Sequence, residues 1–85
     1  MDSAALKALV RDVPDFPEPG VDFKDITTLL ADAAGFAASV DALAEPYVDA
    51  GVDVVVGIEA RGFFFSAPVA RQLGAGLVPI RKPGK

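Results

Sequence analysis

The chain has 85 residues, of which 52% are hydrophobic, and it carries a net charge of −4 at pH 7. A chain of this length forms at most one small domain, and its composition excludes a disordered or a fibrous protein. The sequence contains neither cysteine nor histidine. These absences exclude a disulfide framework, a thiolate metal site and acid–base catalysis by histidine.

The sequence shows no sign of a membrane span or of a targeting segment. No apolar run approaches the roughly 20 residues that a membrane-spanning helix needs. The first residues, MDSAALKALVRD, contain acids and lack the apolar core of a signal peptide. We therefore expect an intracellular protein that is located in the cytoplasm.

Acidic and basic residues are unevenly distributed along the chain. All twelve acidic residues lie at or before Glu59, so the first 59 residues carry a net charge of −9 and the last 26 carry +5. The terminal sequence RKPGK supplies three of the bases, Arg81, Lys82 and Lys85. Such a separation predicts an anionic ligand near the C-terminal part, although an ordinary solvated surface explains an isolated base such as Arg71.

The first thirty residues predict a short helix followed by a surface arm. Residues 1–13 show apolar residues at helical spacing after Ser3, which we expect to cap the helix before Pro14 ends it. The arm covers residues 14–30, where several prolines and a glycine exclude a helix or a central strand. Near its end, Asp25 is expected to cap a helical turn through ITTLL.

Residues 31–85 predict a helix and then a strand–helix–strand unit. The helix is expected over 33–50, with Asp32 as its cap and with Pro46 either kinking the helix or loosening its last turn. The run VDVVVGI is typical of a parallel strand that is buried on both faces, and LVPI is expected to be a second parallel strand after a crossover helix. The predicted fold class is α/β. Because two strands are too few for a stable sheet, we expect the chain to be the N-terminal part of a larger domain.

The sequence GIEARGF lies where the first of these strands meets the following helix. Ligands of open parallel sheets bind beyond the carboxyl ends of the strands, a place taken here by Glu59, Ala60, Arg61 and Gly62. The free N–H groups of the helix start and the guanidinium of Arg61 favour an anion, and Gly62 allows a close backbone approach. Since the bases after LVPI follow a parallel strand, we expect them at the same edge, around a diphosphate or polyphosphate. A local ion pair between Glu59 and Arg61 is the alternative.

Three stretches together resemble the N-terminal half of the adenine phosphoribosyltransferases, which are type I phosphoribosyltransferases. They are PDFPEPGVDFKDITTLL, VVVGIEARGF and VPIRKPGK, and the resemblance covers essentially the whole chain in order. It implies the phosphoribosyltransferase fold and a reaction of purine salvage, in which adenine and 5-phosphoribosyl 1-diphosphate give AMP and diphosphate. It also implies Mg²⁺ that is bound with the diphosphate substrate and not by a protein site in this chain. A cytoplasmic homodimer without nucleic-acid or membrane partners is expected.

The resemblance implies one set of diphosphate-binding residues from two strand ends: Glu59, Ala60, Arg61, Gly62, Arg81, Lys82 and Lys85. The first four are similar to the family's diphosphate-binding loop, in which a strained or cis peptide often occurs. The last three resemble the bases that begin the family's mobile catalytic loop and reach the diphosphate. The resemblance assigns no catalytic residue and no metal ligand within the chain.

The arm resembles the hood that covers adenine in this family, with Val21, Phe23 and Lys24 as the matching residues. The resemblance implies that backbone groups read the edge of the base and that Phe23 supplies an apolar contact. Packing of Phe23 within the arm is the alternative. In an extended arm, Val21 and Phe23 point to one side and Lys24 points to the other.

The chain lacks the family's signature for the ribose 5-phosphate. This signature is an apolar strand that ends in two acids before a loop rich in threonine and glycine, and it is absent from these residues. We therefore expect the 85-residue chain alone to be inactive. The alternatives are a phosphoribosyltransferase for another purine such as xanthine, a non-catalytic ligand-sensing domain and a truncated domain on the same fold.

Overall fold

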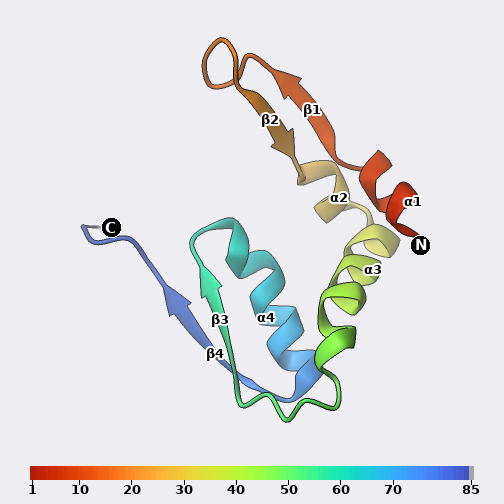
Figure 1. Ribbon diagram of the computed structural model, residues 1–85, viewed down its shortest axis with the longest axis vertical. Coiled ribbons are helices and arrows are strands. Elements are labelled where there is room, and N and C mark those ends of the chain that lie inside the picture. The colour runs from red at the N-terminus through yellow and green to blue at the C-terminus, as the bar shows by residue number, and fades with distance from the viewer. Residues whose placement is uncertain (85) are drawn as a thin grey trace. The chain divides into compact units, whose positions relative to one another are not determined.

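The computed structural model describes residues 1–84 and divides the chain into two compact units, with the boundary after Ser39. Each unit contains one two-stranded sheet, as Figure 1 shows. Helix α3, Ala33–Ala44, contributes residues to both units. None of the helices in this described part is both long and apolar enough to span a bilayer.

The first unit begins with helix α1, Ser3–Ala8. Its N-cap is Asp2, whose Oδ1 accepts a hydrogen bond from the N–H of Ala5 at 2.8 Å. The prediction that Ser3 caps this helix is therefore wrong. The carboxylate of Asp2, one residue earlier, satisfies one of the N–H groups that a helix start leaves free. The helix also ends before Pro14 is reached, because the chain has already entered a strand.

A β-hairpin begins three residues before the predicted arm and continues into it. Strand β1, Arg11–Pro14, pairs antiparallel with strand β2, Asp22–Asp25, and Val13 lies opposite Phe23. The prolines do not prevent this pairing, because Pro14 is the last residue of an edge strand and the other two lie in the connecting loop. A shorter helix and a strand thus replace the helix that we expected over the first thirteen residues.

Local hydrogen bonds stabilise the loop between the two strands. Oδ1 of Asp15 accepts from the N–H of Gly20 at 2.9 Å, and the N–H of Phe16 donates to the carbonyl of Val21 at 3.1 Å. Gly20 has a φ of 87°, which glycine adopts without steric cost. The peptide bond between Phe16 and Pro17 is cis. The loop is therefore an ordered connection.

Helix α2, Thr27–Ala31, follows the hairpin directly and contains the buried residue Leu29. The residue at its N-cap position is Ile26, so the prediction of Asp25 is wrong in position. Asp25 still satisfies a free N–H of the helix start, because its Oδ1 accepts a hydrogen bond from Thr27 N–H at 2.9 Å.

The start and the end of α3 follow the sequence predictions more closely. Oδ2 of Asp32 accepts from the N–H of Gly35 at 2.7 Å, which confirms the predicted cap. At its end, α3 gives way to the 3₁₀ helix η1, Glu45–Tyr47, which contains Pro46. The predicted disturbance at Pro46 is confirmed, but the regular helix is shorter than expected because the proline ends it.

The second unit contains the predicted parallel strand–helix–strand arrangement. Strand β3, Val54–Ile58, is followed by helix α4, Arg61–Leu73, and by strand β4, Gly76–Ile80. The two strands pair in parallel and α4 packs beside them (Figure 1). Gly74 ends the helix with a φ of 68°, a left-handed conformation that glycine adopts without steric cost.

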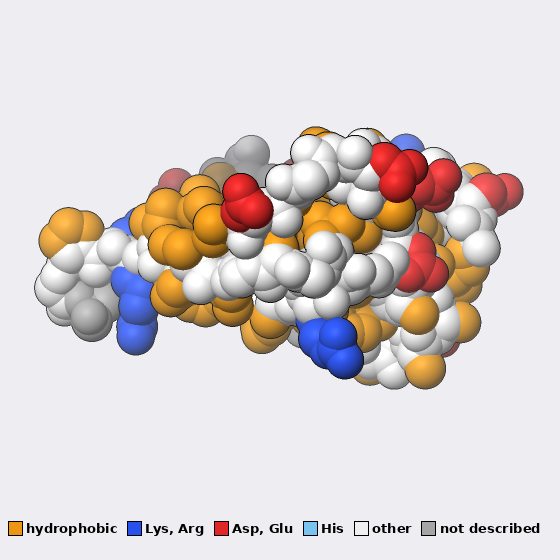
Figure 2. Space-filling model, turned by 90° about the horizontal axis from the view of Figure 1, so that it is seen from below, with side chains coloured by type: hydrophobic (Ala, Val, Ile, Leu, Met, Phe, Trp, Pro, Cys, Tyr) orange, Lys and Arg blue, Asp and Glu red, His pale blue; other side chains and the backbone are white. Residues whose placement is uncertain are grey.

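One face of this sheet is not covered within the second unit. Val56, Ile58 and Ile80 are 54%, 63% and 47% exposed, and the orange areas of Figure 2 show how widely hydrophobic side chains reach the surface. The sequence predicted β3 to be buried on both faces, as parallel strands usually are. In the described residues this prediction is wrong, because α4 covers only the other face.

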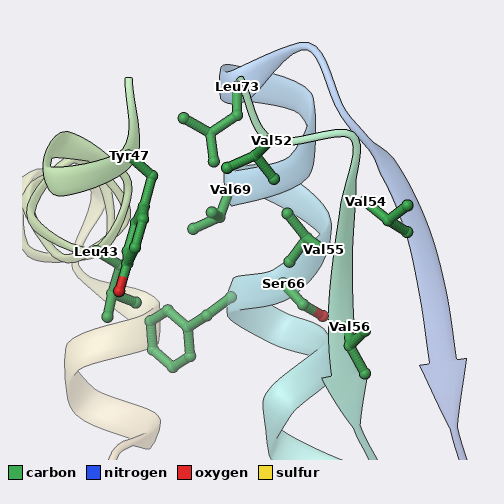
Figure 3. Close-up of a pocket in the computed structure, with 10 residues that line it drawn as sticks. Leu43, Tyr47, Val52, Val54, Val55, Val56, Ser66, Val69 and Leu73 are labelled. Carbon is green, nitrogen blue, oxygen red and sulfur yellow. The ribbon is translucent and has the colours of Figure 1, made fainter. Parts of the chain in front are cut away.

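Helix α4 approaches β3 closely at Gly57. A Cβ atom added to Gly57 would lie 2.1 Å from Oγ of Ser66 and 2.8 Å from its Cβ. Figure 3 shows the Ser66 side chain between the helix and the strand. Ser66 is only 7% exposed, and its hydroxyl has no hydrogen-bond partner among the described residues. The absence of a side chain at Gly57 therefore permits this helix–sheet contact.

Candidate functional site

The carboxyl ends of β3 and β4 lie at the same edge of their sheet, as the sequence predicted. The parallel register pairs Ile58 with Ile80. The ladder continues for one more bond, from the N–H of Glu59 to the carbonyl of Ile80 at 3.0 Å. The chain after β3 is thereby joined to the chain after β4.

The basic residues of the candidate site follow these two strand ends. Arg61 is the first residue of α4 and is exposed, and Arg81 and Lys82 come directly after β4. The structure therefore brings these three predicted residues to one edge of the sheet. The fourth predicted base, Lys85, lies outside the described residues.

The turn from β3 into α4 has the features expected of an anion-binding loop. Ala60 is the N-cap of α4 and makes no side-chain cap hydrogen bond. The N–H groups and the positive dipole end of this 13-residue helix therefore lie at the site. The peptide bond between Glu59 and Ala60 is cis, a conformation that the resemblance implied for this loop. A Cβ added to Gly62 would lie 3.8 Å from the carbonyl carbon of Gly57 in β3, an ordinary van der Waals distance.

The carboxylate of Glu59 faces the chain segment that follows β4. Oε1 accepts a hydrogen bond from the backbone N–H of Lys82, and Oε2 lies 3.8 Å from Nε of Arg81. The Glu59 side chain is 9% exposed and that of Arg81 is 62% exposed. The distance to Arg81 is too long for a hydrogen bond but short enough for attraction between opposite charges.

Phe23, the aromatic residue of the predicted hood, lies beside a hollow of about 270 Å³ in the hairpin. The hollow is lined by Arg11, Val13, Phe16, Phe23 and Asp25. The rings of Phe16 and Phe23 pack edge to face, with centroids 5.3 Å apart. Sequence reasoning missed Phe16, and the signal that could have found it is the aromatic residue within PDFP.

The other two predicted hood residues are placed differently from Phe23. The ammonium of Lys24 pairs with Asp12 and lies 3.0 Å from Oδ2 of Asp22, which share its face of the hairpin. Val21 lies in the loop, where its N–H donates to the carbonyl of Glu18 at 3.2 Å. The structure therefore brings Phe23 to the hollow and places the Lys24 side chain on the opposite side of the strand.

Two titratable groups of the hairpin have shifted pKa values. The pKa of Asp25 is lowered to about 2, first by the hydrogen bond from Thr27 N–H and then by Arg11. Nε and Nη2 of Arg11 donate to Oδ2 of Asp25 at 3.0 and 2.7 Å. The pKa of Lys24 is raised by its hydrogen bonds to Asp12 and, to a lesser degree, Asp22. Of these pairs, Arg11 with Asp25 and Lys24 with Asp12 connect β1 to β2.

A larger hollow of about 370 Å³ in the second unit has no charged residue in its lining (Figure 3). Its lining consists of apolar residues, one tyrosine and one serine: Leu43, Tyr47, Val52, Val54, Val55, Val56, Phe65, Ser66, Val69 and Leu73. Without a cation, this hollow does not suit an anion. The charged edge of the sheet remains the candidate functional site.

Comparisons with known proteins agree on one kind of relative, although no family model matches the chain. An adenine phosphoribosyltransferase from Thermosynechococcus vestitus is 59% identical over 80 residues, which are 94% of this chain and 47% of that protein. The crystal structure of the enzyme of the same name from Thermoanaerobacter pseudethanolicus has a TM-score of 0.92 and 46% identity, and the match covers 99% of this chain and 50% of that one.

A third relative is the adenine phosphoribosyltransferase of Saccharomyces cerevisiae, with a TM-score of 0.87 and 36% identity. That match covers 96% of this chain and 51% of the yeast chain. The chain thus spans about half the length of the relatives that it matches. These likenesses confirm the resemblance and the fold class that the sequence predicted.

Proposed function

Because these 85 residues correspond in sequence and fold to about half of an adenine phosphoribosyltransferase, we propose that they are part of such an enzyme. The proposed reaction belongs to purine salvage and transfers the 5-phosphoribosyl group from 5-phosphoribosyl 1-diphosphate to adenine, which gives AMP and diphosphate. The observation that carries this proposal is the joined edge of β3 and β4, where Arg61, Arg81 and Lys82 follow neighbouring strand ends.

The roles of the bases follow from the charge that develops in the reaction. The bond between C1 of the ribose and the diphosphate oxygen breaks, and its electron pair leaves with the diphosphate. N9 of adenine bonds to C1, and the proton of N9 is released to water or to the departing diphosphate. Positive charge grows on the sugar and negative charge on the leaving group. Fixed positive groups stabilise the leaving group without transferring a proton. We assign this role to Arg61, Arg81, Lys82 and the start of α4, and by extension to Lys85.

Magnesium is included in the proposal only as a companion of the substrate. The described residues contain no group of three or more acidic side chains placed to hold a metal ion. The carboxylate nearest the site, Glu59, is 9% exposed and faces the end of β4. We therefore propose that Mg²⁺ would be held by the diphosphate substrate, whose negative charge it would offset.

The adenine side of the site is assigned to the hairpin. The related Saccharomyces cerevisiae structure contains adenine together with an imino-altritol bisphosphate. In this chain, the hollow beside Phe23 offers aromatic and aliphatic surface to a flat base. Val21 and Lys24 complete the proposed hood through their backbone groups, since the Lys24 side chain is paired with carboxylates.

The proposal extends to domain boundaries, assembly and location. Residues 14–30 form the hood and residues 31–85 begin the catalytic core, and the remainder of the domain is supplied by the half that the relatives possess in addition. We propose a cytoplasmic homodimer without nucleic-acid or membrane partners. A chain without cysteine suits a reducing compartment, and light scattering of the complete enzyme measures its oligomeric state.

A chimera tests the proposed reaction. These 85 residues are joined to the part of the Thermosynechococcus vestitus protein that lies outside the matched region. We expect the chimera to form AMP from adenine and 5-phosphoribosyl 1-diphosphate, and to use adenine in preference to xanthine. The 85-residue chain alone is expected to form none. A folded chimera that uses neither purine would contradict the proposal.

Substitution of Arg61 in the same chimera tests the proposed site. Loss of one fixed group that stabilises the leaving group lowers kcat/KM by about 100-fold, so we expect this loss for Arg61→Ala. The matched control is Arg71→Ala, because Arg71 is an exposed arginine in the last turn of the same helix. The kcat/KM values of the two variants should therefore differ strongly. Equal values would show that Arg61 does not stabilise the leaving diphosphate.

A further inference from the structure

The carboxylate of Glu59 contacts the end of β4 through both of its oxygens. Oε1 accepts a hydrogen bond from Lys82 N–H, and Oε2 lies 3.8 Å from Nε of Arg81. The side chain is 9% exposed, so little of it is left to contact a ligand. Direct contact with diphosphate would also bring like charges together, which is unfavourable.

We propose that Glu59 is a positioning residue, which fixes Arg81 and Lys82 at the diphosphate site and does not bind the diphosphate itself. This inference rests on the function proposed above. It changes the role that the resemblance implied for Glu59, from a ligand of the diphosphate to the residue that holds two of its ligands.

Two hydrogen bonds from Glu59 join the strand ends. Its N–H donates to the carbonyl of Ile80 at 3.0 Å, and its side chain accepts from Lys82 N–H. The connection between β3 and β4 therefore continues for two residues beyond Ile80. The next residues, Pro83 and Gly84, already form a turn. Glu59 thus restrains the backbone of the first two basic residues at a point where a strand end would otherwise be free to move.

The charge of Glu59 has a second effect on the same site. It attracts the guanidinium of Arg81, which is 62% exposed, and so offsets part of the positive potential that a diphosphate meets. Removing the charge while keeping an acceptor should retain the position of Lys82 and strengthen anion binding. Removing the whole side chain should release Lys82 and Arg81 and weaken it. The two substitutions are therefore expected to act in opposite directions.

The test compares Glu59→Gln, Glu59→Ala and the control Glu45→Gln in the 85-residue chain. Glu45 is an exposed glutamate of the same unit, so its substitution makes the same change in net charge. Amide hydrogen exchange at Lys82 and titration with inorganic diphosphate, with and without Mg²⁺, are followed by NMR. We expect exchange at Lys82 to be roughly tenfold faster in Glu59→Ala, because a charge-assisted hydrogen bond is lost.

The expected results separate the inference from other roles of Glu59. Glu59→Ala should bind diphosphate several-fold more weakly, Glu59→Gln as tightly as the unsubstituted chain or more tightly, and Glu45→Gln without change. Equal exchange at Lys82 in the unsubstituted chain and in Glu59→Ala would overturn the inference. Equal losses of binding in Glu59→Gln and Glu59→Ala would also overturn it, because the charge itself would then be required.

Two further measurements keep the test decisive. If exchange at the Val55 amide shows that Glu59→Ala is unfolded, Glu59→Asp replaces it, since the shorter side chain withdraws the carboxylate from Lys82 and should give the same faster exchange. If the unsubstituted chain binds no diphosphate, the proposed function is contradicted. Exchange at Lys82 in the variants still decides whether Glu59 positions that residue.

Discussion

The hairpin of the first unit and the strand–helix–strand arrangement of the second are both built on two strands, but different forces hold them. In the hairpin, ion pairs join β1 to β2, and the ring pair of Phe16 and Phe23 borders a hollow. In the second unit, α4 packs tightly on β3, with Ser66 directly against Gly57.

This difference suits the two tasks that we assign to them. A site for a charged leaving group needs positively charged side chains in fixed positions, and a packed helix beside a pair of parallel strands holds them there. A hood over a base is a surface element, and binding elements on surfaces are typically drawn from the less stable parts of a protein. A substitution that disturbs packing should therefore destabilise mainly the second unit, and a fall of pH should destabilise the hairpin.

The largest effect is expected from Gly57→Ala. The added Cβ would lie 2.1 Å from Ser66 Oγ, so α4 and β3 must separate, and we expect the free energy of unfolding to fall by roughly 1–3 kcal/mol. Denaturant unfolding of the 85-residue chain measures this change. Gly62→Ala is the matched control, because its Cβ would approach the neighbouring strand β3 no closer than 3.8 Å, at the carbonyl carbon of Gly57.

Ser66→Ala sharpens the same prediction. The Ser66 hydroxyl is buried without a described partner, so its removal should not destabilise the chain and should relieve part of the clash in a double substitution with Gly57→Ala. An unfolding free energy for Gly57→Ala equal to that of the unsubstituted chain would show that the helix does not depend on this contact.

Acid should weaken the hairpin through Asp25. The pKa of Asp25 falls from 3.8 to about 2 on folding, because Thr27 N–H and Arg11 stabilise the carboxylate. Asp25 therefore stabilises the hairpin above pH 3.8, and this contribution is lost as the pH falls towards 2. We expect the NMR shift of the Thr27 amide to titrate with a midpoint near 2, and a midpoint near 3.8 would contradict the contact.

Asp25→Asn provides the control for the acid prediction. The amide side chain does not titrate, so the hairpin signals of this variant should lose the transition assigned to Asp25 while those of β3 stay unchanged. A transition of the same size in Asp25→Asn would assign the acid effect to other carboxylates.

The smallest effect is expected at the first helix. Asp2→Ala removes the N-cap hydrogen bond to Ala5 N–H, a change that typically costs about 1 kcal/mol of helix stability. Ser3→Ala should change nothing, because Ser3 is not the cap. Amide exchange at Ala5 and Leu6 measures both substitutions, and faster exchange in Ser3→Ala alone would reverse the assignment.

The success of sequence reasoning also differed between the units. The parallel strands were predictable because β3 is a nearly uninterrupted β-branched run and glycine follows α4. The hairpin was missed because its pairing joins residues such as Val13 and Phe23, which are ten positions apart, across a loop whose prolines exclude regular structure. A complementary pattern of charges on the two sides of that loop, with Asp12 facing Lys24, was the available signal.

The candidate site was predictable in place but not in detail. Parallel strands put Arg61 and Arg81 at one edge, and this follows from topology alone. The role of Glu59 does not follow from topology, because no local sequence pattern predicts the direction of a carboxylate side chain. Only the structure shows that it faces the end of β4.

The most direct test of the central claim is the footprint of inorganic diphosphate on the ¹⁵N-labelled 85-residue chain. The account predicts saturable changes in the amide signals of residues 59–63 and 81–82, where the two strand ends meet, and none in the hairpin at residues 11–25. Changes that centre on Arg11 and Lys24, or the absence of any saturable change at Arg61 and Arg81, would contradict it.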